Sequence, residues 1–221
     1  AVEFDRVKLS HRYGEELVRA GKLDEGIPVL VDTLRELGVA VPEPGSLWMI
    51  PRFMWERARL EWRGYDYELR PESELPEREY LTLEALGTLA GVVGAMDLSL
   101  SAYCSQVFCR LALESGAPGA ISAALALQSN QEMIREATRD RARSMLDEAK
   151  SLIEHSERGA ELWPVYAFQV GMTHYYAGEF RDCVYYLHST IELPLEDVHD
   201  YFEDPELPEA VEDIEITRRN N

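Results

Sequence analysis

Apolar side chains recur every three or four positions along most of the chain, which is the period of an α-helix. The first such series comprises Phe4, Val7, Tyr13 and Leu17. The pattern predicts helices over about 4–20, 47–63, 77–95, 98–115, 119–136, 139–155, 160–177 and 180–193, and another between Gly21 and Gly38. We expect an extended connection at 65–76, where prolines interrupt the period.

Small residues recur at matching places in these segments, which indicates an internal repeat. Four small anchors are spaced 76, 40 and 41 residues apart: Gly26, Ala102, Ala142 and Cys183. A further small residue follows seven positions after each anchor. Small residues at fixed places let two antiparallel helices approach closely, while larger side chains fill the groove to the next pair. The pattern therefore predicts an all-α stack of helix pairs over residues 1–193, with an irregular unit at about 46–76.

Two of the predicted pairs resemble tetratricopeptide (TPR) units. Both carry small residues inside the helices and a glycine at the turn: Gly14, Gly21 and Gly26 in one pair, and Gly171, Gly178 and Cys183 in the other. The spacing near 40 residues exceeds the usual ~34 of that family, so the match is to a TPR-like repeat with longer helices. The resemblance implies an α-α superhelix, a right-handed solenoid of antiparallel helix pairs.

Five short phrases are similar to the helical region that follows the ATPase module in bacterial proteins joining a Ser/Thr protein kinase to an AAA-type ATPase. These phrases are Leu17–Gly26, Leu34–Gly38, Trp55–Leu60, Glu74–Pro76 and Leu111–Gly116. The resemblance implies that the chain is a fragment of a larger bacterial signalling protein with kinase or ATPase modules elsewhere. The start at Ala1 instead of methionine gives the same expectation.

Composition narrows the classes of partner. The 221 residues include 22 basic and 41 acidic ones, for a formal charge of −19, so the surface repels nucleic-acid phosphates and anionic lipids. The most apolar stretch, Leu86–Met96, is shorter than the ~20 residues of a membrane span. We expect no nucleic-acid and no membrane partner. Three cysteines, an odd number at no metal-ligand spacing, argue against a disulfide framework and favour a reducing, cytoplasmic location.

Acidic residues dominate the end of the chain. From Glu192 onward there are eleven acidic residues and two basic ones, and such a sequence buries too little apolar area to fold. We expect residues 194–221 to form a disordered acidic tail. Asp197, His199 and Asp200 offer ligands for a weak divalent-ion site, although an acidic tail in water is the simpler interpretation.

Enzyme signatures are missing from the sequence. It contains no G-x-x-x-x-G-K-[ST] phosphate loop, no H-R-D or D-F-G motif and no G-x-S-x-G motif. His174 stands where other repeats carry apolar residues, so we expect a hydrogen-bonded core histidine there. We therefore predict a noncatalytic domain with no cofactor and no metal. The alternative, an enzyme that uses scattered carboxylates and histidines, would depend on His174 or His199.

The TPR-like resemblance implies that the first helix of each pair lines a concave, partner-binding surface. In the last pair this face would carry Phe168, Met172, Tyr175 and Tyr176. Earlier pairs would present polar or basic residues: His11, Arg19, Gln131 and Arg135. Aromatic residues and methionine are enriched in interface centres. The alternative is that Tyr175 or Tyr176 packs against a neighbouring helix.

Three tryptophans form a further stripe. Trp48, Trp55 and Trp62 are spaced by seven residues and lie within about 40° of one line along a helix. We expect most of this stripe to be core, and an exposed anchor for a partner is the alternative.

These expectations favour a noncatalytic protein-interaction or sensor scaffold. It would bind a protein or peptide and couple that partner to other domains of its parent chain. The alternative function is a helical pocket that binds a small ligand, as in related signal-transducing ATPases. A closed apolar cavity near Tyr175 would favour that alternative.

Overall fold

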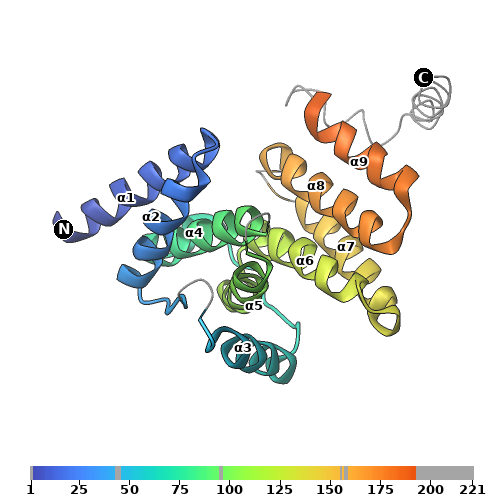
Figure 1. Ribbon diagram of the computed structural model, residues 1–221, viewed down its shortest axis with the longest axis horizontal. Coiled ribbons are helices and arrows are strands. Elements are labelled where there is room, and N and C mark those ends of the chain that lie inside the picture. Colours follow the sequence, from blue (N-terminus) through green and yellow to red (C-terminus); the bar gives the residue numbers. More distant parts are fainter. Residues whose placement is uncertain (1, 43–45, 95–96, 155, 157–158, 193–221) are drawn as a thin grey trace. The chain divides into compact units, whose positions relative to one another are not determined.

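The computed structural model describes residues 2–42, 46–94, 97–154, 156 and 159–192 (Figure 1). These residues form helices and no β-strand, which confirms the all-α class. The α-helices are α1 (Val2–Arg19), α2 (Leu23–Glu36), α3 (Met49–Arg63), α4 (Glu77–Val93), α5 (Leu98–Ser115), α6 (Pro118–Met133), α7 (Arg139–Glu154), α8 (Gly159–Ala177) and α9 (Phe180–Glu192). No helix within the described ranges combines the length and apolar character that a membrane crossing needs.

The chain divides into two compact units, residues 1–127 and 128–221. The division falls inside α6, through which the helical period runs without a break. The expected boundary at 193 and the acidic tail, with its Asp197, His199 and Asp200, lie outside the described residues.

In the N-terminal unit, α1 and α2 form a hairpin that needs glycine at its turn and at its crossing. Gly21 turns the chain with φ +76°, a conformation that side chains with a Cβ rarely adopt. At the crossing, a Cβ on Gly26 would lie 2.9 Å from Val18 Cγ2 and 3.0 Å from the backbone oxygen of Gly14. The two helices therefore approach to backbone distance, as the small residues predict.

The core of this unit forms where α4 packs against α1, α2 and α5. Its fully buried leucines include Leu30, Leu34, Leu86, Leu89 and Leu100. Burying each such side chain stabilises the fold by roughly 1.5–3 kcal/mol relative to exposure. Helix α3 packs against α5, and the buried Glu56 carboxylate on α3 accepts a hydrogen bond from Arg110 Nε on α5 at 3.1 Å. That ion pair fixes which face of α3 points inward.

The irregular connection between α3 and α4 is held against the ends of two other helices. The backbone N–H of Arg70 donates to the Gly116 carbonyl at the end of α5, at 2.9 Å. The Glu72 carboxylate accepts from the Gly119 N–H in the first turn of α6, at 3.1 Å. Gly116 has φ +75°, and a Cβ there would overlap the Glu68 carbonyl oxygen. The connection thus supplies partners for helix ends that would otherwise lack them.

In the C-terminal unit, α8 packs against α7 and α9. Gly178 turns the chain between α8 and α9 with φ +80°. A Cβ on Gly171 would lie 2.9 Å from Leu187 Cγ, and a Cβ on Gly14 in the first hairpin would lie 3.0 Å from Leu30 Cγ. Positions that match in the repeat therefore make the same contact in both hairpins.

Candidate protein-interaction surface

Helix α8 carries apolar side chains on two faces. Its inner face is buried and includes Trp163, Tyr166, Ala167, Val170 and Gly171. A helix that is apolar all round is ordinarily buried all round. Here, however, Phe168, Tyr175 and Tyr176 remain 42%, 52% and 38% exposed. The outer face of α8 is therefore an apolar surface that the rest of the described unit leaves exposed.

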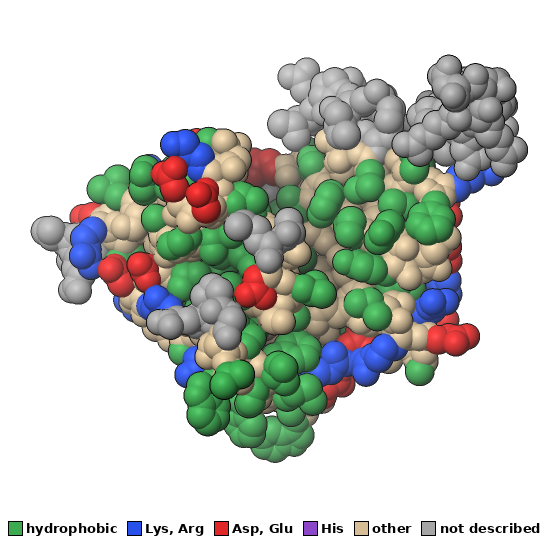
Figure 2. Space-filling view, in the orientation of Figure 1, with side chains coloured by type: hydrophobic (Ala, Val, Ile, Leu, Met, Phe, Trp, Pro, Cys, Tyr) green, Lys and Arg blue, Asp and Glu red, His purple; other side chains and the backbone are tan. Residues whose placement is uncertain are grey.

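These outer residues and the start of α9 form one cluster, which we define as the aromatic surface: Phe168, Met172, Tyr175, Tyr176 and Phe180. The Tyr175 ring contacts two others edge-on, with ring centroids 5.6 Å from Tyr176 and 6.0 Å from Phe180. The spacing of residues 168, 172, 175 and 176 places them on one side of α8. Figure 2 shows hydrophobic side chains gathered over α8 and α9. Phe180 is 63% exposed and belongs to a helix that sequence analysis did not assign to this face.

Two of the polar residues expected on the equivalent face of an earlier pair belong to this unit. Gln131 is half-buried on α6. Arg135, just beyond the end of α6, is exposed and donates to the Glu132 carboxylate at 3.2 Å. Because Glu132 is fully buried, Arg135 neutralises a carboxylate that is costly to leave without a cation. The Arg135 guanidinium is therefore already engaged in an ion pair that stabilises the fold.

The two expected site residues of the N-terminal unit differ from each other. Arg19 is exposed and pairs with Glu16 at 3.0 Å. His11 does not face outward as expected, because its side chain is only 2% exposed. The reason is that this face of α1 packs against α4, where Glu15, one turn from His11, accepts a hydrogen bond from Thr88 at 3.4 Å. His11 therefore cannot contribute to an exposed binding face.

The most polar cluster near the aromatic surface joins three helices. His174 Nδ1 lies 2.7 Å from Glu179 Oε2, and Arg143 Nη2 donates to Glu179 Oε1 at 3.1 Å. The hydrogen bond from His174 and the charge of Arg143 hold the pKa of Glu179 below its ordinary value. The His174 ring also stacks on Tyr186, with centroids 5.4 Å apart. His174 is hydrogen-bonded, as expected, but only partly buried.

The same cluster contains the group of side chains best suited to a metal ion in the described chain. One ligand atom each of His174, Glu179 and Asp182 lies within 4.8 Å of the other two. Glu179 already accepts hydrogen bonds from His174 and Arg143. These contacts tie α7 and α8 to the turn before α9 without requiring an ion.

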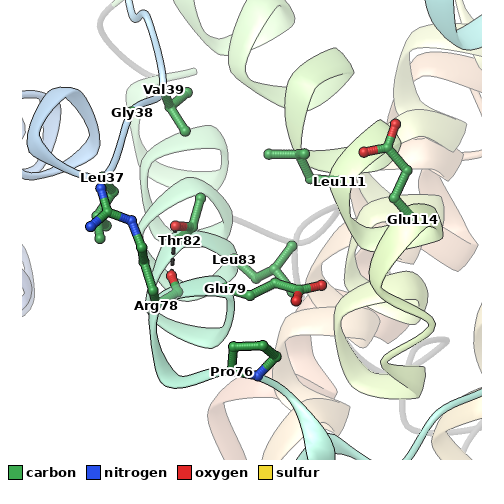
Figure 3. A pocket seen from close by; sticks show the side chains of 10 residues that line it. All are labelled: Leu37, Gly38, Val39, Pro76, Arg78, Glu79, Thr82, Leu83, Leu111 and Glu114. Carbon is green, nitrogen blue, oxygen red and sulfur yellow. Dashed lines mark hydrogen bonds between the residues drawn. The ribbon is translucent and has the colours of Figure 1, made fainter.

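A recess of about 490 Å³ lies in the N-terminal unit, between the end of α2 and helices α4 and α5 (Figure 3). Figure 3 shows Leu111 reaching from α5 toward α4, which carries Leu83 and Glu79. Glu79 accepts a hydrogen bond from Arg70 at 3.2 Å, and Glu114 accepts from Arg110 at 3.1 Å. The charged groups at the rim are therefore engaged, and the walls are largely apolar. Residues of the N-terminal unit line this recess, whereas Tyr175 belongs to the C-terminal unit. The recess is therefore formed by other residues than the cavity expected near Tyr175.

The tryptophan stripe is the second exposed apolar feature. The expectation that it is core is wrong, because Trp48, Trp55 and Trp62 are all more than 60% exposed. The opposite face of α3, with Met49 and Leu60, is buried instead. The spacing identified the stripe, but only the packing of α3 on α5 shows which side is covered.

Comparison with known proteins gives a match over the end of the chain. Residues 181–221 match the model of a family of unknown function (DUF7110). No curated protein and no solved structure matches the chain. The matched segment begins directly after Phe180 and therefore excludes the aromatic surface.

Proposed function

We propose that this chain is a noncatalytic protein-interaction or sensor module that binds a protein or peptide through the aromatic surface of α8 and α9. One observation carries the proposal: four aromatic side chains on one side of α8 and at the start of α9 remain 38–63% exposed. At about 200 Å² per aromatic side chain, they present about 400 Å² of apolar surface. That area is roughly half of the ~800 Å² that each partner contributes to a specific interface.

The proposal includes a TPR-like stack of helix pairs as the scaffold. It is supported by the equivalent glycine–leucine contacts of the first and last hairpins, Gly14–Leu30 and Gly171–Leu187. In such a stack, neighbouring pairs bury each other's inner faces and leave an outer face available for a partner. We further propose that the module belongs to a larger bacterial signalling protein of the cytoplasm and couples its partner to kinase or ATPase modules there.

The test is a peptide selection on the purified chain. A phage-displayed peptide library would be selected, and the affinity of a recovered peptide measured by isothermal titration calorimetry. Tyr175→Ala and Phe168→Ala should each weaken binding by at least tenfold, since truncated aromatic anchors of this kind dominate interface energy. Leu9→Ala is the matched control, because Leu9 is 67% exposed on α1 and lies outside the surface. Unchanged affinity in both aromatic variants, with helical content retained, would refute the proposal.

A second candidate function is favoured by the recess beside Leu111. Its volume of about 490 Å³ lies within the roughly 300–1,000 Å³ of small-molecule sites, which are mostly apolar. A library of neutral aromatic fragments, titrated into the chain, should then shift the methyl resonances of Leu83 and Leu111 saturably. Absence of such shifts would remove this candidate and leave the peptide-binding proposal untouched.

A further inference from the structure

The outer face of α3 is a continuous apolar stripe. Trp48, Trp55 and Trp62 are 71%, 66% and 92% exposed. Figure 2 shows hydrophobic side chains gathered over α3. At about 250 Å² per fully exposed indole side chain, the three tryptophans present about 570 Å². This already reaches the roughly 300–600 Å² of the largest patch on an ordinary monomer.

Helix α3 holds this stripe in a fixed orientation. On its inner face Leu60 is fully buried and Met49 nearly so. The Glu56 carboxylate accepts hydrogen bonds from Arg110 on α5 at 3.1 Å and from Arg59 at 3.0 Å. Removing either partner of such a buried pair is costly, so the inner face is strongly specified. The tryptophans are therefore presented outward by a helix that cannot easily rotate.

The stripe has the form of a ridge with recesses, which matches the surface of another helix. Consecutive tryptophans are seven residues apart, which is about 10 Å along the helix axis. Between them stand Pro51 and Ala58, two small exposed residues in the same line. Large side chains alternating with small ones at heptad spacing let a second helix insert its own side chains between the rings.

The two edges of the tryptophan stripe carry different types of side chain. Helical geometry places Arg52 and Arg59 along one edge, and Met54 and Glu61 along the other. Arg52 and Arg59 are both exposed. With four arginines and two glutamates, α3 is locally basic in a chain whose formal charge is −19. Distant acidic residues are screened beyond about 8 Å at physiological salt, so the local edge decides what can dock.

This charge pattern selects among the possible occupants. In an antiparallel pair of α3 helices, like edges meet, and Arg52 would lie beside Arg59 of the copy. In a parallel pair, the arginine edge would meet the edge with Met54 and Glu61, and Glu61 already lies 4.0 Å from Arg57 of its own helix. A second copy is therefore disfavoured. The alternation of large and small side chains at heptad spacing favours a helix over an anionic lipid surface, which has no side-chain ridges to fit between the rings.

We propose that the outer face of α3 is a docking site for an amphipathic helix with an apolar seam and an acidic edge. The seam packs between the tryptophans, and the acidic edge pairs with Arg52, because Arg59 already donates to the Glu56 carboxylate at 3.0 Å. This site is separate from the aromatic surface of α8, and the proposal does not rest on the function proposed above.

Two three-heptad peptides test the proposal on the full chain. They share a leucine seam, and their flanking positions carry glutamate in one peptide and lysine in the other. The glutamate peptide should bind saturably, at least tenfold more tightly than the lysine peptide, and more weakly as salt is raised. Binding would be followed by calorimetry. Failure of both peptides to bind, or equal binding of the two, would overturn the proposal.

Variants of α3 assign the binding to this face. Trp55→Ala should weaken the glutamate peptide by at least tenfold, and Arg52→Ser by a few-fold with a smaller salt dependence. Leu9→Ala, an exposed apolar residue on α1, is the control and should leave the affinity unchanged. Because Trp55 is exposed, its variant should retain the thermal stability of the parent chain. Unchanged affinity in Trp55→Ala would overturn the proposal.

Two further measurements distinguish the other occupants. Sedimentation equilibrium of the full chain should show no self-association that depends on Trp55. Flotation with vesicles of anionic phospholipid should show no binding that depends on Trp55. A Trp55-dependent dimer would replace the proposed occupant by a second copy, and Trp55-dependent flotation would replace it by a membrane surface.

Discussion

Replacing Gly26 by alanine tests the close approach of α1 and α2. The new methyl group would lie 2.9 Å from Val18 Cγ2, 3.0 Å from the Gly14 carbonyl oxygen and 3.1 Å from Leu17 Cβ. The last two atoms belong to the backbone or sit directly on it, so they cannot rotate away. The hairpin must therefore open, which disturbs packing along its whole length.

The expected effect combines two opposing contributions. Alanine is favoured over glycine in a helix by about 1 kcal/mol. Overpacking a well-filled site costs about 1–3 kcal/mol, and the upper end applies here because backbone atoms obstruct the methyl group. Gly26→Ala should therefore lower the free energy of unfolding by about 2 kcal/mol and the melting temperature by about 4–8 °C.

Gly91→Ala is the matched control for Gly26→Ala. Gly91 also lies within a helix of the N-terminal unit, but a Cβ there would meet no atom within 4 Å. Only the helix-propensity gain remains, so this variant should be more stable by up to about 1 kcal/mol. Urea unfolding followed by circular dichroism measures both values, with an unchanged m-value as the condition for comparing them. A Gly26→Ala chain as stable as Gly91→Ala would refute the packing argument.

Two further predictions concern titration and thiol chemistry. Because the hydrogen bond from His174 and the charge of Arg143 lower the pKa of Glu179, this carboxylate stabilises the fold above its ordinary pKa of 4.5 and loses that contribution as pH falls through its lowered value. In His174→Ala, an NMR titration should find the pKa of Glu179 closer to 4.5, and an unmoved pKa would contradict the assignment of the cause. Burial raises the pKa of the Cys104 thiol to about 12, so a thiol reagent at about pH 8 should label Cys104 only after unfolding. Fast labelling of the native chain, detected by mass spectrometry, would contradict that burial.

Sequence periodicity predicts the helices well, because their boundaries depend on local chemistry. Gly21 and Gly178 end helices by adopting positive φ, a conformation that glycine reaches without strain. The small residues at Gly14 and Gly171 likewise predict close helix crossings, because only a missing side chain leaves room for Leu30 and Leu187. These features depend only on residues within one helix hairpin, which are close together in the sequence.

The covered side of a helix is less predictable, because it depends on residues far away in the sequence. For α3, two faces are apolar, and the inner one is chosen by Arg110, which lies more than fifty positions after Glu56. For His11, the covering helix is α4, some seventy residues later. The division of the chain inside α6 is invisible for the same reason, since no break in the period marks it.

The aromatic surface was partly predictable. Phe168, Tyr175 and Tyr176 follow helical spacing on α8, and all three are exposed. Phe180 was missed because it opens the next helix, and the Gly178 turn brings it back against Tyr175. A signal was present in the sequence, since a two-residue link between helices must place their adjoining ends side by side.

The connection between α3 and α4 is held by hydrogen bonds to other helices, and this limits which insertions and deletions the chain tolerates there. Its hydrogen bonds reach Gly116 and Gly119, which belong to neither of the helices it joins. Deleting residues around Arg70 and Glu72 would therefore uncap two distant helix ends instead of merely tightening a loop. A connection with only a short 3-10 helix at Glu72–Glu74 therefore holds two other helix ends in place, and insertions that most surface loops accept would weaken the packing around α3.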